Sequence, residues 1–279
     1  MNQTYSEPDI SQRLSISTYV YRGHQPISVR TLARLAEHGI RRIEVNESPD
    51  QFDLTRADSI QHLERDCRDA GVTICAYHAS HTGFTEIDTE DKRRATLDQC
   101  KRQIDTLLTS GGTIWGSHIR ALDEAGEDCL TELLRYVEGT EAVIVLENFP
   151  RSPVFVEDRM QTIERIDHPQ LGLLLDIGHV RNGSGENPMT LAGGPAATLG
   201  RCGDRLRFLH LHGYVDRDHY PPFCDGDRIQ WTELFQKLHD IGYPGYFNFE
   251  PRGLAFFDDT LARVQAMPAR IAALLAAGS

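Results

Sequence analysis

The chain has 279 residues, with 41 acidic side chains against 29 Lys and Arg, a formal net charge of −12 and a hydrophobic content of 40%. This composition is that of an ordinary globular protein, long enough to bury a sizeable core. The acidic balance argues against a protein that binds nucleic acid mainly through the phosphate backbone, because such binding needs clustered Lys and Arg.

In chain order, strand and helix signals alternate. β-branched, aromatic or continuous apolar stretches indicate strands, and apolar residues at helical spacing indicate helices. The pattern predicts a strand at 14–21, a helix at 28–38, a strand at 41–45, a helix at 58–70, a strand at 72–77, a helix at 91–108, a strand at 113–119, a helix at 129–137, a strand at 142–146, a helix at 159–166, a strand within 171–180, a strand at 206–211, a helix at 231–239, a strand at 246–249 and a helix at 261–277.

The remaining segments predict loops. The acidic run 123–128 is expected to be a solvated loop, and the segments 181–203 and 214–226, rich in Gly, Pro and Asn, are expected to be long loops. The polar start of the chain lacks the apolar segment of a signal peptide, and no apolar run reaches membrane-spanning length. We assign residues 1–13 to a flexible N-terminal tail.

The six cysteines are scattered without a CxxC pair, which is typical of reduced thiols. Together with the absence of a signal or membrane segment in the sequence, this predicts a cytoplasmic protein.

The order of these elements indicates the fold class. Strands that alternate with helices form right-handed crossovers and a parallel sheet. Eight such units in about 250 residues fit a (β/α)8 barrel better than a doubly wound sheet. The apolar run LGLLLDIGHV at 171–180 does not alternate, as expected for a parallel strand buried on both faces. We therefore predict an α/β fold, with a single (β/α)8 TIM barrel over residues 14–279.

Polar side chains stand where most of the predicted strands end. A barrel brings the carboxyl ends of its strands to one rim, so these residues are expected to meet. Burying several carboxylates without a cation is costly, so the pattern predicts a divalent-metal site, with Mn, Mg, Co or Zn as candidates. The residues are Glu44, His78, His118, Glu147, Asp176, His179, His212 and Glu250, with Asp218 and His219 in the loop after the seventh strand.

Five motifs carry a resemblance to a known family: LEN at 146–148, DIGH at 176–179, HLHG at 210–213, DHYPP at 218–222 and IGYPGYFNFE at 241–250. With them the chain resembles, over residues 14–250, the xylose isomerase-like TIM-barrel superfamily. This superfamily joins sugar isomerases and epimerases to endonuclease IV and cobamide-remodelling phosphodiesterases. The resemblance implies that the core metal ligands are Glu147, Asp176, His212 and Glu250. It also implies that His179 binds the substrate or a further metal and that His210 packs within the barrel.

Two chemistries fit this barrel. In the first, a sugar or sugar-phosphate isomerase or epimerase, one metal ion polarises the carbonyl of a keto-sugar, and Glu147 and Glu250 move a proton off and onto carbon through an enediolate. Glu44 and Arg252 are then candidate substrate contacts. In the second, a phosphodiesterase of the endonuclease IV type, two or three metal ions are held with the help of His78, His118, His179, Asp218 and His219.

We favour the isomerase or epimerase. The acidic charge argues against DNA as a substrate, so the alternative phosphodiesterase is expected to act on a small molecule such as a cobamide precursor. A third alternative is a barrel that binds metal and sugar without catalysis. The expected partner is a small sugar, a sugar phosphate or a phosphodiester; nucleic acid and membranes are not expected, and a homo-oligomer is left open. Trp115 and Trp231 are expected in the core.

Overall fold

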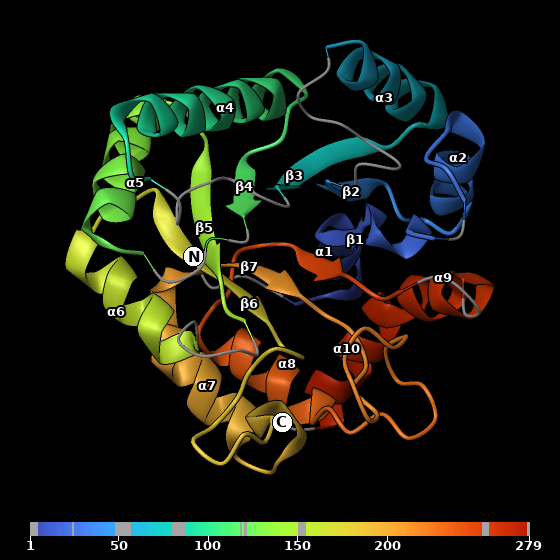
Figure 1. Cartoon of the computed structure of the whole chain (residues 1–279). Helices are drawn as coiled ribbons and strands as arrows, with labels where there is room; N and C mark the ends of the chain where they lie inside the picture. The colour runs from blue at the N-terminus through green and yellow to red at the C-terminus, as the bar shows by residue number, and fades with distance from the viewer. Residues whose placement is uncertain are drawn as a thin grey trace.

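The computed structural model describes residues 5–23, 25–47, 57–79, 87–117, 119, 122–149, 155–252 and 257–277. Within these residues, eight parallel strands form one sheet in the order β7-β6-β5-β4-β3-β2-β1-β8. A further parallel bridge between Leu211 and Phe249 brings the two edges together. Figure 1 shows the helices as an outer ring around these strands. The predicted (β/α)8 TIM barrel is confirmed.

The strands follow the predicted apolar runs closely. Their bounds are β1 Leu14–Ser17, β2 Arg42–Asn46, β3 Thr73–Ala79, β4 Ile114–Ser117, β5 Val143–Glu147, β6 Leu171–Asp176, β7 Leu206–His210 and β8 Phe247–Phe249. Every residue of β6 is buried, as expected for a strand covered on both faces. Pairing between neighbouring strands sets Asn46 opposite His78 and Asp176 opposite His210. This register gathers polar strand ends at one rim of the barrel.

The helices cover the outside of the sheet. They are α1 Glu7–Gln12, α2 Val29–Glu37, α3 Ala57–Ala70, α4 Glu90–Thr109, α5 Glu124–Val137, α6 Val156–Ile166, α7 Gly194–Cys202, α8 Trp231–Asp240, α9 Phe257–Gln265 and α10 Met267–Ala277, with 3-10 turns η1 Thr18–Tyr21, η2 Pro188–Thr190 and η3 Gly203–Arg205. The described chain thus contains more helix than the sequence predicts, most clearly at α1 and α7.

The N-terminal segment is packed rather than flexible in its described part. Where we predicted a tail, Glu7–Gln12 forms α1, whose Ile10 is fully buried. The Tyr5 hydroxyl donates hydrogen bonds to the carbonyls of Leu238 and Tyr243, 2.9 and 3.0 Å away. With only two apolar anchors in this segment there is no helical periodicity to detect, so the sequence pattern does not predict α1.

Two predicted loops contain helix. Asp123 caps α5 by accepting a hydrogen bond from the Gly126 amide, so the rest of the acidic run forms the first turns of that helix. The predicted loop 181–203 contains α7, whose N-terminus is held by the Glu233 carboxylate: the amides of the N-cap residue Gly193 and of Ala196 donate to it at 2.9 and 3.0 Å. This cap comes from a residue far along the chain and cannot be seen in the local sequence.

Two further elements differ from the prediction. The strand predicted at 14–21 stops at Ser17 and continues as η1. The helix predicted at 261–277 is divided into α9 and α10 at Pro268, which stands in the first turn of α10, where a proline is tolerated. Both differences reflect local backbone geometry that apolar periodicity does not report.

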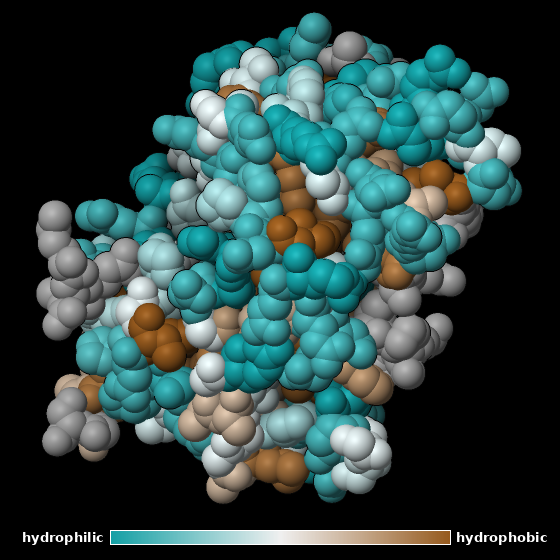
Figure 2. Space-filling view, turned by 90° about the vertical axis from the view of Figure 1, so that its left-hand side faces the viewer, coloured by the Kyte–Doolittle hydropathy of each residue, from teal (hydrophilic) through white to brown (hydrophobic). Residues whose placement is uncertain are grey.

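Apolar side chains fill the space between the strands and the helices. Trp115 and Trp231 are both buried there, as predicted. Seen from the side, the surface is mostly hydrophilic, with hydrophobic residues in small separate groups (Figure 2). Among the described helices, none combines the length and the apolar character needed to cross a bilayer. The cytoplasmic location stays a prediction.

Candidate metal centre

The structure brings most of the predicted site residues together at the carboxyl ends of the strands. His118 lies outside the described residues. Asp218, His179 and His219 stand in loops and are partly exposed. The fully or almost fully buried members are Glu44, His78, Glu147, Asp176, His210, His212 and Glu250. The site is thus a layer of buried acids and imidazoles with a more open layer above it.

Asp176 has one oxygen anchored and the other directed into the site. Its Oδ1 accepts hydrogen bonds from the amides of Gly178 and His179, at 2.8 and 3.0 Å, and from His212 Nε2 at 3.0 Å. Its Oδ2 is buried without a hydrogen-bond partner among the described residues. This oxygen lies 3.5 Å from His179 Nδ1 and 3.7 Å from His210 Nδ1. Such an arrangement suits a carboxylate that gives one oxygen to a metal ion.

Gly178 makes this anchoring possible. A Cβ atom at this position would collide with the buried ring of His212 and would lie 2.7 Å from the Cβ of Asp218. We expect Gly178→Ala to lower the free energy of unfolding by about 1–3 kcal/mol, the usual cost of overpacking. Chemical denaturation measures this difference. Gly183→Ala is the matched control, because no atom lies within 4 Å of a Cβ placed at Gly183; equal stability of the two variants would contradict the collision.

His210 lies at the centre of the buried layer, although the resemblance implied only a packing role. Its Nε2 lies 2.9 Å from Glu44 Oε1, and a carboxylate only accepts, so Nε2 carries the proton. Asn248 holds the other Glu44 oxygen at 3.0 Å. The opposite ring atom, Nδ1, is 3.0 Å from Glu250 Oε2 and 3.5 Å from Glu147 Oε1. A carboxylate behind an imidazole is the usual way to direct the other nitrogen toward a metal.

His212 has a different environment. The backbone N–H of His219 donates to His212 Nδ1 at 2.9 Å, so the proton of the ring stands on Nε2 and is donated to Asp176 Oδ1. Both ring nitrogens are therefore engaged within the protein. Among the described residues, three groups have donor atoms within 4.8 Å of one another and could hold a metal ion, and none of them includes His212. Two of these groups share His210: one is Glu147, Asp176 and His210, and the other is Glu44, His78, His210 and Glu250.

A second donor group, which does not contain His210, lies above the buried layer. Asp176, His179 and His219 also have donor atoms within 4.8 Å of one another. His179 Nε2 is 3.4 Å from Asp218 Oδ2, and its Nδ1 is 3.5 Å from Glu147 Oε1. His219 has a positive φ of 61°, a backbone conformation that is uncommon outside glycine. The loop after β7 thus presents an acid and an imidazole to the end of β6.

Two asparagines that the sequence analysis did not assign to the site orient its acids. Asn46 Nδ2 donates to His78 Nδ1 at 2.9 Å and to Glu250 Oε1 at 3.2 Å. His78 Nε2 in turn lies 3.1 Å from Glu147 Oε2. Asn148 pairs with the backbone of Asp176, accepting from its N–H and donating to its carbonyl. Asn148 belongs to the LEN motif, and Asn46 ends β2, so the position at a strand end was the available signal.

The two predicted substrate contacts lie in contrasting places. Glu44 is buried behind His210, and its two oxygens face His210 and Asn248. Arg252 is exposed at the rim, and its backbone N–H donates to the carbonyl of His219 at 2.9 Å. Glu44 therefore acts on the site through His210, whereas the role of Arg252 stays a prediction.

Acids and imidazoles shift each other's pKa values in this site. Burial raises the pKa of the Asp176 carboxyl, but the charges of His179 and His212 outweigh it and hold the pKa well below its usual value. Burial likewise acts on Glu250, but His210 lowers its pKa to about 2. Burial opposes a charge on His210, yet the Glu250 carboxylate raises the pKa of that imidazole well above its usual value. The acids thus stay ionised and favour a positive charge among them.

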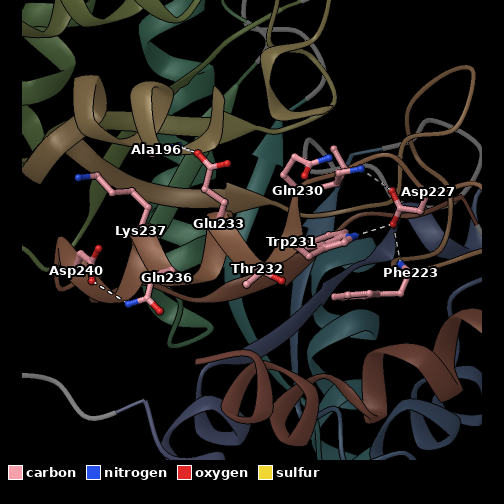
Figure 3. A pocket seen from close by; sticks show the side chains of 11 residues that line it. Ala196, Phe223, Asp227, Gln230, Trp231, Thr232, Glu233, Gln236, Lys237 and Asp240 are labelled. Atoms are coloured by element: carbon pink, nitrogen blue, oxygen red, sulfur yellow. Dashed lines mark hydrogen bonds between the residues drawn. The ribbon is translucent and has the colours of Figure 1, made fainter. Parts of the chain in front are cut away.

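A groove of about 590 Å³ lies away from this centre, along α8 (Figure 3). Its floor includes Trp231, whose Nε1 donates to Asp227 Oδ2 at 2.7 Å. The same carboxylate accepts from the backbone amides of Phe223, Tyr214 and Ile229. The groove contains none of the predicted site residues, and Asp227 serves to shape the loop after β7.

Comparisons with known proteins agree with the fold. A family model described as a xylose isomerase-like TIM barrel matches residues 32–271. An uncharacterised protein of Methanocaldococcus jannaschii, MJ1311, is 24% identical over 149 residues, which are 50% of this chain and 47% of that protein. The match therefore spans less than half of the relative's length.

Two solved structures share the fold. D-psicose 3-epimerase of Clostridium cellulolyticum H10, solved with D-tagatose, superposes with a TM-score of 0.71 at 16% identity, covering 94% of this chain and 99% of the other. A xylose isomerase-like TIM-barrel protein of Mycobacterium smegmatis, solved in complex with magnesium, gives a TM-score of 0.71 at 16% identity and covers 98% and 99% of the two chains. At 16% sequence identity, the similarity of these two structures to this chain is a similarity of fold.

Proposed function

Because the chain belongs to the xylose isomerase-like TIM-barrel family, we propose that it is a divalent-metal-dependent sugar or sugar-phosphate isomerase or epimerase. The observation that carries the proposal is the convergence of three acids on one imidazole. Glu147, Asp176 and Glu250 each place an oxygen within 3.0–3.7 Å of His210 Nδ1. The epimerase solved with D-tagatose has the same fold, which supports a small sugar as the partner.

We assign the metal ligands to Glu147, Asp176, His210 and Glu250, with His210 in place of the expected His212. Three carboxylates and one imidazole suit Mn²⁺, Mg²⁺ or Co²⁺, and the buried Asp176 Oδ2 gives such an ion a ligand directed at the centre. When bound, the ion supplies a Lewis acid that polarises the carbonyl of a keto-sugar. The magnesium complex of the Mycobacterium smegmatis protein supports a divalent ion on this fold.

The chain's own residues then move the proton. Carboxylates beside the reacting carbon are suitable bases, and we assign Glu147 and Glu250 to remove and return a proton on carbon. His78 and Asn46 hold the oxygens of these two acids that face away from His210. His212 Nε2 and the backbone N–H of Gly178, in the turn after β6, both donate hydrogen bonds to Asp176 Oδ1 and hold this carboxylate. The two proposed general bases, Glu147 and Glu250, are therefore held in place before a substrate arrives.

Exchange of carbon-bound hydrogen with solvent tests the proposal. The Mn²⁺-loaded protein is incubated in D₂O with a panel of ketoses and ketose phosphates, and NMR follows deuterium uptake beside the carbonyl and the appearance of an epimer or isomer. We expect exchange with at least one member of the panel, lost after treatment with EDTA and restored by Mn²⁺. Metal-loaded protein that exchanges no hydrogen with any member would overturn the proposal.

A second candidate function rests on the second donor group. Asp176, His179 and His219, with Asp218 beside His179, supply further ligands of the kind that a phosphodiesterase of the endonuclease IV type requires. Metal analysis separates the two candidates. About one ion per chain favours the isomerase or epimerase, whereas two or three ions per chain, together with hydrolysis of bis(4-nitrophenyl) phosphate, favour the phosphodiesterase.

A further inference from the structure

Two arginines at the rim of the barrel, Arg22 and Arg252, lie against the ring of the same tyrosine, Tyr19. The guanidinium carbons of Arg22 and Arg252 lie 5.5 and 6.0 Å from the centre of the Tyr19 ring. In the part of the chain that the structure describes, neither guanidinium forms an ion pair. Other arginines of the described chain pair with carboxylates instead: Arg34, Arg93, Arg94, Arg165, Arg201, Arg205 and Arg263.

This pair stands next to the metal centre. The Tyr19 ring lies 5.0 Å from the ring of His219, a member of the second donor group. Arg252 follows Glu250 by two residues, and its backbone N–H donates to the carbonyl of His219 at 2.9 Å. Burial raises the pKa of the Tyr19 hydroxyl, while the nearby charges of Arg252 and Arg22 act to lower it.

We propose that Arg22, Tyr19 and Arg252 form an anion clamp that binds a phosphoryl group of the substrate at the rim. The proposal rests on the proposed function and narrows it to a phosphorylated substrate. A guanidinium presents its N–H groups in a fork that matches phosphate oxygens, and a phenol adds one donor. In a chain with a net charge of −12, two arginines beside the site also counter the repulsion of an anionic substrate.

Binding of inorganic phosphate to the full-length, Mn²⁺-loaded protein tests the clamp by calorimetry. We expect the double variant Arg22→Gln, Arg252→Gln to raise the Kd of phosphate by about tenfold or more, since each hydrogen bond to a charged group contributes substantially. Arg217→Gln is the matched control. Arg217 also lies over a tyrosine, 5.8 Å from the ring of Tyr220, but that tyrosine donates to the carboxylate of Asp216.

Phosphate that binds the double variant as tightly as the wild type would overturn the clamp, and so would an equal loss in Arg217→Gln. If phosphate is held by the metal ion alone, the double variant and the wild type bind it equally tightly. Unchanged metal content and circular dichroism confirm that each variant is folded, which is expected because Arg22 and Arg252 are exposed.

Substrate kinetics separate the clamp from the proposed function. The double variant is expected to raise the KM of a ketose phosphate by a larger factor than the KM of the unphosphorylated ketose. If the wild type turns over a ketose phosphate and the variant has the same KM, the clamp fails and the function stands. If no ketose reacts but phosphate binding weakens in the variant, the function fails and the clamp stands. A rise in KM for bis(4-nitrophenyl) phosphate identifies a diester as the source of the phosphoryl group.

Discussion

Glu147→Gln is expected to reduce kcat of the metal-loaded enzyme by about 10²- to 10⁴-fold, the range that a positioned general base contributes. Glu147 is buried, its Oε1 lies 3.5 Å from His210 Nδ1, and its Oε2 lies 3.1 Å from His78 Nε2. A glutamine keeps the shape and can still accept from His78, but it has no basic oxygen. Steady-state kinetics with the ketose identified by deuterium exchange measure the loss.

Metal analysis of the same variant distinguishes a lost base from a lost ligand. Glu147→Gln with a full complement of metal and low kcat indicates the loss of the base, whereas a parallel loss of metal indicates the loss of the ligand. Glu186→Gln is the control, because Glu186 is exposed in the loop after β6. Glu250→Gln is expected to behave as Glu147→Gln does. Turnover at the wild-type rate in either variant, with the metal bound, would remove that residue from the proton transfer.

Much of the architecture could be predicted because apolar runs report burial directly. The continuous run of β6 and the acids that close β5, β6 and β8 indicated parallel strands and a polar rim. The short helices could not be predicted in this way. α1 is fixed by two anchors, Tyr5 and Ile10, and α7 is capped by Glu233 from another part of the chain. Such contacts are set by tertiary packing, which a local pattern does not contain.

The choice between two histidines shows the same limit inside the site. His210 and His212 are two residues apart at the end of a strand, so alternation sends both side chains to the same face. Their roles differ because of what lies behind each ring. A carboxylate, Glu44, faces His210 Nε2, whereas the amide of His219 occupies His212 Nδ1. The motif HLHG is compatible with either histidine as a ligand, and only the packed partners separate them.

His210→Ala is expected to weaken binding of Mn²⁺ or Co²⁺ more than His212→Ala does. Loss of a residue that orients a ligand costs about 10- to 100-fold in metal affinity, which is the effect we expect for His212→Ala through Asp176. Loss of His210 removes a ligand and leaves Glu147 and Glu250 without the imidazole between them. Competition with a chelator of known affinity measures both dissociation constants. Weaker binding in His212→Ala than in His210→Ala would restore His212 as the ligand.

The absorption spectrum of the Co²⁺-loaded protein gives a readout that does not depend on affinity. Visible bands of Co²⁺ respond to the set of ligand atoms, so His210→Ala should change them while His212→Ala leaves them close to those of the wild type.

Glu44→Gln is expected to weaken metal binding indirectly, because a glutamine can turn its amide N–H toward His210 Nε2 and move the ring proton to Nδ1. This variant should bind Co²⁺ more weakly than the wild type although Glu44 itself is no ligand. A Co²⁺ affinity equal to that of the wild type would show that Glu44 does not direct His210 toward the metal.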